Sequence, residues 1–316
     1  MKQDIHLIGF GSQASAWAEA LRTQGLEVHV YLHDRKSPSF GRAVAKGFSS
    51  RLLADLPHAL AATTTLQAVA FLCPDHKIGM IYQEVLARLD QKLLLILAHG
   101  YAVYSNELTV KNPQHELALL APKAVGPRLL GEFQKHHPRP HGLGAGFYAQ
   151  SPHARGLLLR LAKSLGFSES NLIGATFEQE AIGDLISEQG LLCGGVFTLL
   201  EWTLEKMQKA GIPERLIREE CFTELELIAS LIKERGPAAT FKAISPAAQC
   251  GATLMREALY QSDAPSVFDS QLNTITNGEF VRQMRSPQWK DKAEIFRSKL
   301  EELERNLFKE SEPQKS

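Results

Sequence analysis

Residues 5–14, IHLIGFGSQA, decide the fold, because they join a short apolar run to the pattern Gly9-x-Gly11-x-x-Ala14. The apolar run ending in glycine predicts a buried strand, and the periodicity from about residue 13 to 24 predicts a helix. Glycines at such a junction allow a tight turn and a close approach of the backbone to a pyrophosphate at the helix N-terminus. We therefore expect a dinucleotide site rather than a purely structural turn, formed by Gly9, Phe10, Gly11, Ser12 and Gln13.

Further apolar runs alternate with helical patterns through the first half of the chain. Residues 28–32, 68–73 and 93–97 are near-continuous apolar segments, as expected of strands that are buried on both faces, and 117–120 and 144–148 are weaker candidates. This alternation predicts an α/β fold with a Rossmann-type, doubly wound, mostly parallel sheet.

After about residue 172 the alternation stops. The pattern is helical over 177–235, a charged helix is predicted over 291–309, and a frayed tail is predicted over 310–316. We therefore predict two domains, a dinucleotide-binding domain over 1–172 and an all-helical domain over 173–316.

The formal charge of the chain is zero, with 35 basic and 35 acidic residues, but the two halves differ. Residues 1–172 hold 18 Lys and Arg against 12 Asp and Glu, residues 173–316 hold 17 against 23, and all 11 histidines lie in the first half. The balanced total gives no support for a nucleic-acid or membrane-surface partner, and no apolar stretch reaches the ~18 residues of a membrane span. The asymmetry predicts two domains with different chemistry.

The cysteines bear on the compartment. Cys73, Cys193, Cys221 and Cys250 show no Cys-x-x-Cys spacing and are interpreted as reduced, mostly buried thiols. No signal-peptide pattern opens the sequence. Both features predict a cytoplasmic protein.

The segment after the second predicted strand bears on the choice of cofactor. An acidic side chain at this point holds the ribose 2′-hydroxyl of NAD, whereas basic and hydroxyl groups hold the 2′-phosphate of NADP. Here the acidic Asp34 follows His33 and is outnumbered by Arg35, Lys36, Ser37 and Ser39. The segment favours NADPH and leaves NADH as the alternative.

Two i, i+4 pairs of carboxylates stand out in the acidic half: Asp184 and Glu188 on one predicted helix, Glu220 and Glu224 on another. The spacing places each pair on one helix face among apolar neighbours, where carboxylates without cations would cost several kcal/mol each. Oxygen-only ligands select hard cations such as Mg²⁺. Together the pairs predict a metal site, whereas either pair alone would be interpreted as a solvated helix face.

Several motifs, in order along the chain, resemble those of the ketol-acid reductoisomerase (acetohydroxyacid isomeroreductase) family, in its short form with one helical domain per chain. The resemblance covers most of residues 5–280. It rests on Gly9-Phe10-Gly11-Ser12-Gln13, Pro74-Asp75, Ala98-His99-Gly100, Ala121-Pro122-Lys123, the stretch from Glu180 to Gln189, Leu192-Cys193-Gly194-Gly195, the stretch from Glu220 to Leu225, and Ile244-Ser245.

The resemblance implies an enzyme that depends on metal and nucleotide. It implies two Mg²⁺ bound by the four carboxylates, with Asp184 bridging, and NADPH as the hydride donor. The substrate would be a 2-hydroxy-2-alkyl-3-keto acid such as 2-acetolactate, in valine and isoleucine synthesis, which undergoes an alkyl shift and then reduction. The family's helical domains interlock as a knotted dimer in which one protomer supplies the second glutamate pair, so a homodimer or a multiple of dimers is implied.

The resemblance also implies roles for single residues. Two residues that the family places in the substrate pocket have an alternative interpretation. Cys193 is then a packing residue, and Ser245 is a helix cap. The implied catalytic residues are His99, Lys123, Asp184, Glu188 and Glu224, further cofactor contacts are Pro74, Asp75 and Gly100, and the substrate contacts are Cys193, Ile244, Ser245 and Ala248.

The sequence departs from the family pattern at Ala14-Ser15, Ala102-Val103-Tyr104, Ala124 to Pro127 and Ala247 to Gly251, which includes Gln249-Cys250. The metal ligands are intact while these neighbours differ, a pattern typical of a member whose substrate or rate has changed. The first hypothesis is the enzyme of valine and isoleucine synthesis. The alternatives are a paralogue for another hydroxy-keto acid, a reductase without isomerisation, a hydroxyacid dehydrogenase, and a non-catalytic nucleotide-binding protein.

Overall fold

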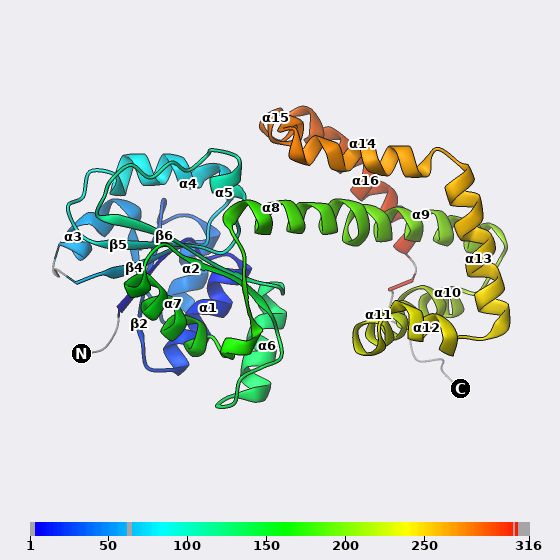
Figure 1. Ribbon diagram of the computed structural model, residues 1–316, viewed down its shortest axis with the longest axis horizontal. Helices are drawn as coiled ribbons and strands as arrows, with labels where there is room; N and C mark the ends of the chain where they lie inside the picture. Colours follow the sequence, from blue (N-terminus) through cyan, green and yellow to red (C-terminus); the bar gives the residue numbers. More distant parts are fainter. Residues whose placement is uncertain (1–3, 62–64, 306, 309–316) are drawn as a thin grey trace. The chain divides into compact units, whose positions relative to one another are not determined.

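The structure is a computed structural model that describes residues 4–61, 65–305 and 307–308 (Figure 1). The chain divides into two compact units, Met1–Gly183 and Asp184–Ser316. The first is termed the sheet unit and the second the helical unit. Each has the architecture that the sequence predicts for its part of the chain.

Within the described residues the sheet unit holds an eight-stranded sheet in the order β3-β2-β1-β4-β5-β6-β7-β8. Neighbouring strands are parallel except β6 and β7, which are antiparallel. This order, which reverses direction at β1, confirms the predicted doubly wound sheet. The strands are β1 (Asp4–Ile8), β2 (Glu27–Leu32), β3 (Ser49–Leu52), β4 (Gln67–Phe71), β5 (Leu93–Leu97), β6 (His115–Pro122), β7 (Ala145–Ala149) and β8 (Leu172–Gly174).

Two strands escape prediction from the sequence. The strand β3 reads Ser49-Ser50-Arg51-Leu52, and β8 is only three residues long. Both lie at the edges of the sheet, where a strand needs few apolar residues. They therefore lack the apolar run by which a buried strand is found, whereas the two weaker candidates are confirmed as β6 and β7.

Helices cover both faces of the sheet (Figure 1), and each face has its own apolar core. Leu7 and Val30 face the core that contains α1 (Ser12–Thr23), α6 (Gly126–His136) and α7 (Pro152–Ser164). Ile8 and Val69 face the other core, with α3 (Leu56–Leu60), α4 (Asp75–Ile81) and α5 (Tyr101–Tyr104). With both faces covered, the carboxyl ends of the strands are where loops can form a site.

Three helices begin at a Ser-Pro step. Ser37, Ser151 and Ser245 each accept a hydrogen bond from the backbone N–H three residues further on, at 3.2, 3.1 and 3.2 Å. Such a cap contributes about 1 kcal/mol, and proline fits the first helical position because it has no N–H to satisfy. These caps fix the starts of α2 (Pro38–Ala45), α7 and α13 (Pro246–Gln261).

The helical unit contains helices and no strand among its described residues, as predicted. The predicted charged helix near the end of the chain is α16, the predicted tail lies outside the described residues, and none of the described helices is long and apolar enough to cross a membrane. The helix α8 (Phe177–Ile186) begins in the sheet unit and ends in the helical unit. The segments that follow are η4 (Ser187–Leu192), α9 (Gly194–Lys209), α10 (Glu214–Arg218), η5 (Glu219–Thr223), α11 (Glu224–Arg235), α12 (Pro237–Ala243), α13, α14 (Ala264–Thr276), α15 (Glu279–Arg285) and α16 (Gln288–Glu304).

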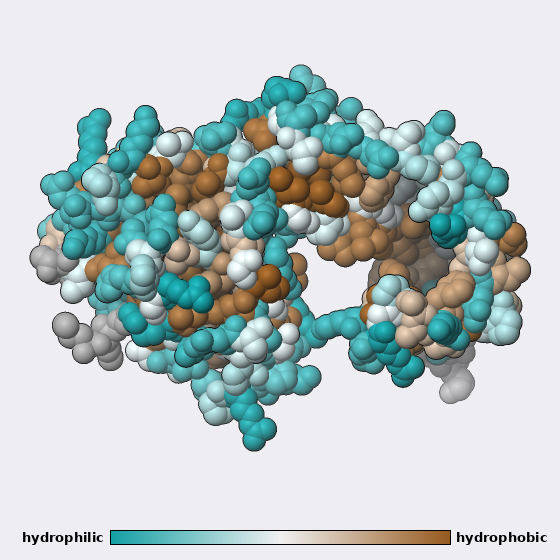
Figure 2. All heavy atoms as spheres, in the orientation of Figure 1, coloured by the Kyte–Doolittle hydropathy of each residue, from teal (hydrophilic) through white to brown (hydrophobic). Residues whose placement is uncertain are grey.

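The helical unit has a small core and a large apolar surface. Its core is a single cluster of Leu204, Ile217, Cys221, Leu303 and Leu307. Apolar side chains lie exposed along its helices (Figure 2), among them Leu191, Leu192, Phe197, Leu199 and Trp202. In the described sheet unit, the exposed large apolar side chains are Val44, Met80, Val125 and Ile173. Large exposed apolar side chains are therefore more numerous on the described helical unit than on the described sheet unit.

Candidate active site

The turn after β1 has the geometry that the glycine pattern predicts. Gly9 adopts a φ of +106°, and a Cβ atom there would lie 2.4 Å from the carbonyl oxygen of Leu72, so only glycine fits. Gly11 is the N-cap of α1, and none of the described side chains caps this helix. The N–H groups of its first turn are thus left for an anion such as a pyrophosphate.

A cleft of about 250 Å³ opens beside this turn. It joins residues of the glycine loop to residues that follow β4 and β5, so three separate sequence motifs meet at the carboxyl ends of their strands. Phe10 is turned away, since its ring is buried against Phe48 with centroids 5.6 Å apart. The lining residues are Gly11, Ser12, Gln13, Phe71, Leu72, Cys73, Asp75, Ile78, Ala98 and His99.

The segment after β2 carries exposed basic side chains. Its acidic residue, Asp34, forms hydrogen bonds within the segment. His33, Arg35 and Lys36 are exposed. The carboxylate of Asp34 accepts a hydrogen bond from the Lys36 N–H at 2.8 Å, and its carbonyl oxygen accepts one from the Ser37 hydroxyl at 2.8 Å. These bonds hold Asp34 within its own turn, although it is exposed like the basic side chains beside it.

Arg42, on α2, ties this segment to the glycine loop and was missed by sequence reasoning. Its guanidinium donates to the Ser39 hydroxyl at 2.8 Å and to the Phe10 carbonyl oxygen at 3.4 Å. The residue lies one turn after Ser39 on the same helix, and this spacing was the available signal.

Glu180, on α8, is a buried carboxylate that the sequence analysis did not assign to the site. Its side chain is 2% exposed. Lys123 Nζ donates to Glu180 Oε1 at 2.6 Å, and the Gly100 N–H donates to Oε2 at 2.5 Å. His99 Nε2 lies 3.8 Å from Oε2. One carboxylate therefore binds Lys123 and the Gly100 backbone and lies near His99, and its hydrogen bonds offset the cost of burying its charge.

Gly100 is required by the close approach of α8. A Cβ atom at this position would lie 2.1 Å from the carbonyl oxygen of Phe177 and 3.0 Å from Glu180 Oε2. Only glycine therefore allows the start of α8 to pack against the end of β5, and this packing delivers Glu180 to its partners. The sequence signal for Glu180 was its place four residues before Asp184, which puts both on one helix face.

His99 stands between two carboxylates. Its Nδ1 atom lies 4.0 Å from Asp75 Oδ2, on the side away from Glu180. Its ring stacks on Tyr101, with centroids 6.1 Å apart and planes 8° apart. Burial raises the pKa of Asp75, although the His99 imidazole opposes this shift. A proton on His99 would thus lie near two acidic neighbours.

Cys73 lines the same cleft, and its thiol is unreactive. Burial is the main cause that raises the pKa of its thiol to about 12, and the Asp75 carboxylate adds to the shift. At neutral pH the thiol stays protonated, so Cys73 contributes shape rather than a nucleophile.

Both predicted pairs of metal ligands lie where a helix changes its winding. Asp184 is in α8 and Glu188 is in the π-helical segment η4, while Glu220 is in the π-helical segment η5 and Glu224 begins α11. Such wide turns occur often at functional sites. Asp184 is half-buried and the other three are exposed. In the described part of a single chain, no group of potential ligands joins one pair to the other.

The residues assigned to the substrate pocket lie on the helical unit. Cys193 is exposed between η4 and α9, and Ile244 is half-buried. Ser245 is a helix cap, because its hydroxyl accepts from the Ala248 N–H at 3.2 Å. The expectation of mostly buried thiols is wrong for Cys193 and Cys250, both exposed, because they lie in the unit that leaves much of its surface uncovered; Cys221 is buried.

Two of the departures from the family pattern alter the surroundings of the cofactor loop. Ser15 donates a hydrogen bond to Glu19 at 3.2 Å and accepts one from Lys46 Nζ at 3.1 Å, so it belongs to a surface network. Gly126 packs on the loop so closely that a Cβ atom would lie 2.4 Å from the Ser12 carbonyl oxygen. The altered segment from Ala124 to Pro127 therefore touches the backbone of the nucleotide loop directly.

Comparisons with solved structures agree with this fold. An NADH-preferring ketol-acid reductoisomerase from an uncultured archean is 23% identical, with a TM-score of 0.80 over 96% of this chain and 91% of that one. A semialdehyde dehydrogenase NAD-binding protein from Cupriavidus necator is 16% identical (TM-score 0.65; 88% and 99% covered). A 1-pyrroline-5-carboxylate reductase from Streptococcus pyogenes is 16% identical (TM-score 0.57; 87% and 99% covered).

Two family models match the chain and together span nearly all of it. Residues 1–170 match the acetohydroxy acid isomeroreductase NADPH-binding domain, which supports a nicotinamide cofactor at the glycine loop. Residues 177–312 match the ketol-acid reductoisomerase C-terminal domain, which contains both carboxylate pairs. The chain belongs to the ketol-acid reductoisomerase family of enzymes, which are both oxidoreductases and isomerases.

Proposed function

We propose that the protein is an Mg²⁺-dependent and NADPH-dependent ketol-acid reductoisomerase, which acts on a 2-hydroxy-2-alkyl-3-keto acid such as 2-acetolactate in valine and isoleucine synthesis. The observation that carries the proposal is the buried carboxylate of Glu180, which holds Lys123 and lies 3.8 Å from His99 beside the dinucleotide cleft. A plain hydroxyacid dehydrogenase needs neither this carboxylate nor the two acidic pairs that follow it in the sequence.

The fixed polar groups suit the proton transfers of this reaction. In the alkyl shift, the C2 hydroxyl loses a proton and the C3 carbonyl oxygen gains one; in the reduction, the new C2 carbonyl accepts a hydride and a proton. Lys123 is held by Glu180 and is 40% exposed, so its ammonium can hydrogen-bond a substrate oxygen. His99, between Asp75 and Glu180, can hold a proton for transfer.

The acidic pairs suit hard cations. Asp184, Glu188, Glu220 and Glu224 offer oxygen donors alone, the set that Mg²⁺ prefers. When bound, the cations would polarise the keto and hydroxyl oxygens as Lewis acids, and the nicotinamide would supply the hydride. In this proposal Asp184 bridges the two cations.

A homodimer, or a multiple of dimers, completes the proposed site. Glu220 and Glu224 are exposed on a unit whose surface carries many apolar side chains, and in the described single chain they join no other ligands. If a second copy of the chain covers this surface, its glutamate pair can meet the first pair of its partner. The proposal therefore makes the metal site a property of two chains.

NADPH is the proposed hydride donor because the exposed Arg35 and Lys36 outnumber the exposed Asp34, whose carboxylate accepts a hydrogen bond within its own turn. Arg35 and Lys36 would hold the 2′-phosphate, with Ser37 and Ser39 nearby. The NADH preference of the archean relative makes NADH the comparison to run.

A spectrophotometric assay of nicotinamide oxidation tests the proposal. The purified chain is given NADPH or NADH with 2-acetolactate or with 3-hydroxy-3-methyl-2-oxobutanoate, with Mg²⁺ and after chelation. We expect Mg²⁺-dependent oxidation of NADPH with 2-acetolactate, abolished in Asp184→Asn. No turnover with 2-acetolactate under any condition would contradict the proposal.

A second candidate is a paralogue with another hydroxy-keto acid as substrate, or a reductase without isomerisation. The observation that favours it is the altered segment that packs on the nucleotide loop at Ser12. Reduction of 3-hydroxy-3-methyl-2-oxobutanoate alone, with 2-acetolactate inert, would establish the reductase.

A further inference from the structure

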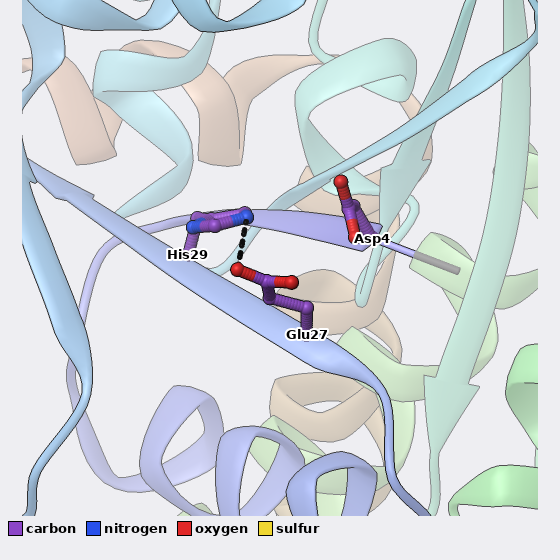
Figure 3. Close-up of side chains that lie close together, drawn as sticks. All are labelled: Asp4, Glu27 and His29. Carbon is purple, nitrogen blue, oxygen red and sulfur yellow. Dashed lines mark ion pairs between the residues drawn. The ribbon is translucent and has the colours of Figure 1, made fainter. Parts of the chain in front are cut away.

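A polar cluster lies at the opposite end of the sheet from the dinucleotide cleft. Asp4 pairs with Glu27, and His6 with His29, at the amino ends of the adjacent strands β1 and β2. Potential ligand atoms of Asp4, Glu27 and His29 lie within 4.8 Å of one another (Figure 3). These residues share the sheet face that elsewhere carries the apolar Ile8 and Val69. Two exposed carboxylates and a buried imidazole therefore converge at this end of the sheet.

His29 is the buried member of the cluster, and burying its ring nitrogens without hydrogen bonds costs free energy. Its side chain is 9% exposed, and neither ring nitrogen makes a hydrogen bond to any described residue. The atom Nδ1 is fully buried, and Nε2 lies 3.8 Å from Glu27 Oε1, which is beyond hydrogen-bonding range. Buried polar groups in proteins normally have a hydrogen-bond partner. His29 Nδ1 has none among the described residues, and Nε2 faces Glu27 from too far for a hydrogen bond (Figure 3), so a ligand between Nε2 and the carboxylates would complete the contacts of His29.

His6 is excluded from the ligand set by its own contacts. Its Nδ1 atom lies 3.2 Å from the Tyr31 hydroxyl, and its ring stacks on His29 with centroids 5.4 Å apart. His6 acts as a wall that limits how the His29 ring can turn.

We propose that Asp4, Glu27 and His29 form a binding site for a divalent transition metal of the zinc class. The mixed set of one nitrogen and two oxygens suits Zn²⁺ better than Mg²⁺, which rarely takes imidazole. Ligand atoms about 2.1 Å from a tetrahedral zinc ion lie ~3.4 Å apart, so the cluster must contract by roughly 1 Å. Glu27 is 57% exposed and Asp4 is also exposed, which leaves both carboxylates room to move in and leaves the ion a path from solvent.

The position of this site indicates a structural role. In a parallel sheet the cofactor binds at the carboxyl ends, and this cluster lies at the amino ends of the first two strands. A metal there would cross-link β1 to β2 without touching the reacting groups. Its binding would stabilise the folded sheet unit, because an ion that binds only the native state shifts the folding equilibrium.

Zinc binding to the metal-stripped full chain tests the proposal by equilibrium dialysis. The proposed acidic pairs of the helical unit also take up zinc, so the comparison is between variants. We expect Glu27→Gln and Asp4→Asn each to bind one equivalent fewer per chain than the wild type, and zinc to raise the unfolding temperature less in both. The matched control is Glu132→Gln, which breaks another His-Glu pair of the sheet unit, with His136 at 3.4 Å, and should bind zinc as the wild type does.

Equal zinc stoichiometry in the wild type, Glu27→Gln and Asp4→Asn would overturn the proposal. A loss of stability in Glu27→Gln without a change in bound zinc would show a simple ion pair of Glu27 and His29, and would overturn it too. Both results are independent of turnover, so they leave the proposed reaction untouched.

Discussion

The sheet unit and the helical unit bury their apolar side chains in opposite ways. The sheet unit closes two apolar cores within one chain and surrounds its one buried carboxylate, Glu180, with partners. The helical unit has one small core and exposes Phe197, Trp202 and many other large apolar side chains. A helix is amphipathic so that one face can be covered, and here much of that face has no cover within the chain. The sheet unit thus buries its apolar side chains within one chain, whereas the helical unit exposes the surface that the proposed dimer would cover.

The largest effect is expected from charges placed on the exposed apolar face. In Leu199→Glu/Trp202→Glu, both changes lie three residues apart on α9, at positions 50% and 55% exposed. If a second chain covers them, two buried carboxylates without partners cost several kcal/mol, roughly 3 or more, and the dimer dissociates. Light scattering should give the mass of a single chain, and circular dichroism should show loss of helix. The control, Val44→Glu on the sheet unit, should leave mass and helicity unchanged. A wild-type protein that is itself monomeric would contradict the proposal that a second chain covers the helical unit.

The next largest effect is expected at Glu180, whose hydrogen-bond partners lie within its own chain. Glu180→Gln removes the charge that pairs with Lys123 and weakens the bond to the Gly100 N–H. Charge-assisted bonds of this kind are worth about 1.5–3 kcal/mol each, so we expect a loss of about 2–4 kcal/mol in urea unfolding. The matched control is Glu178→Gln, two residues earlier on α8 and exposed, with a change within about 0.5 kcal/mol. Equal stabilities of the two variants would show that the buried network adds nothing.

A smaller effect is expected at the nucleotide segment. Arg35→Ala/Lys36→Ala removes two exposed cations but leaves the turn bonds of Asp34, since one of them uses the Lys36 backbone. The Michaelis constant for NADPH should rise about tenfold or more, while that for NADH changes little. Lys135→Ala, an exposed lysine on α6, is the control for net charge. If both cofactors are weakened equally, the segment does not select the 2′-phosphate.

The smallest effect concerns the thiols and involves no change in stability. The thiol of Cys73, which is half-buried and has its pKa raised to about 12, is about 10⁻⁴ ionised at a pH near 8, and the thiol of Cys221 is buried. In Cys193→Ser/Cys250→Ser, we therefore expect almost no labelling of the native protein by a disulfide reagent, and labelling of both remaining thiols in guanidinium. Fast labelling of the native variant would show that the core around Cys73 opens readily.

Much of the sheet unit could be predicted because strands that are buried on both faces of a parallel sheet have near-continuous apolar sequences. The strands β4 and β5 are examples, and the glycine pattern located the nucleotide turn because Gly9 has a positive φ against Leu72. The edge strands β3 and β8 could not be found in this way, since neither has a continuous apolar run.

The candidate site was predictable in its residue types and less so in its connections. The spacing of Asp184 and Glu188 is a local feature of one helix, so it can be read from the sequence. The role of Glu180 depends on a long-range contact with Gly100, 80 residues away, which no local pattern encodes. The exposure of Cys193 escaped prediction for a related reason, because apolar neighbours in the sequence do not tell whether the cover comes from the same chain or another.

The central claim, that each metal site is built by two helical units, is tested most directly by complementation. The variants Asp184→Asn and Glu224→Gln should each be inactive alone. When they are co-expressed, mixed dimers would carry both changes in one site and none in the other, so random pairing should restore about a quarter of the wild-type turnover of 2-acetolactate. Absence of any activity in the mixture, with mixed dimers confirmed by mass spectrometry, would show that both carboxylate pairs of a site come from the same chain and would contradict the account.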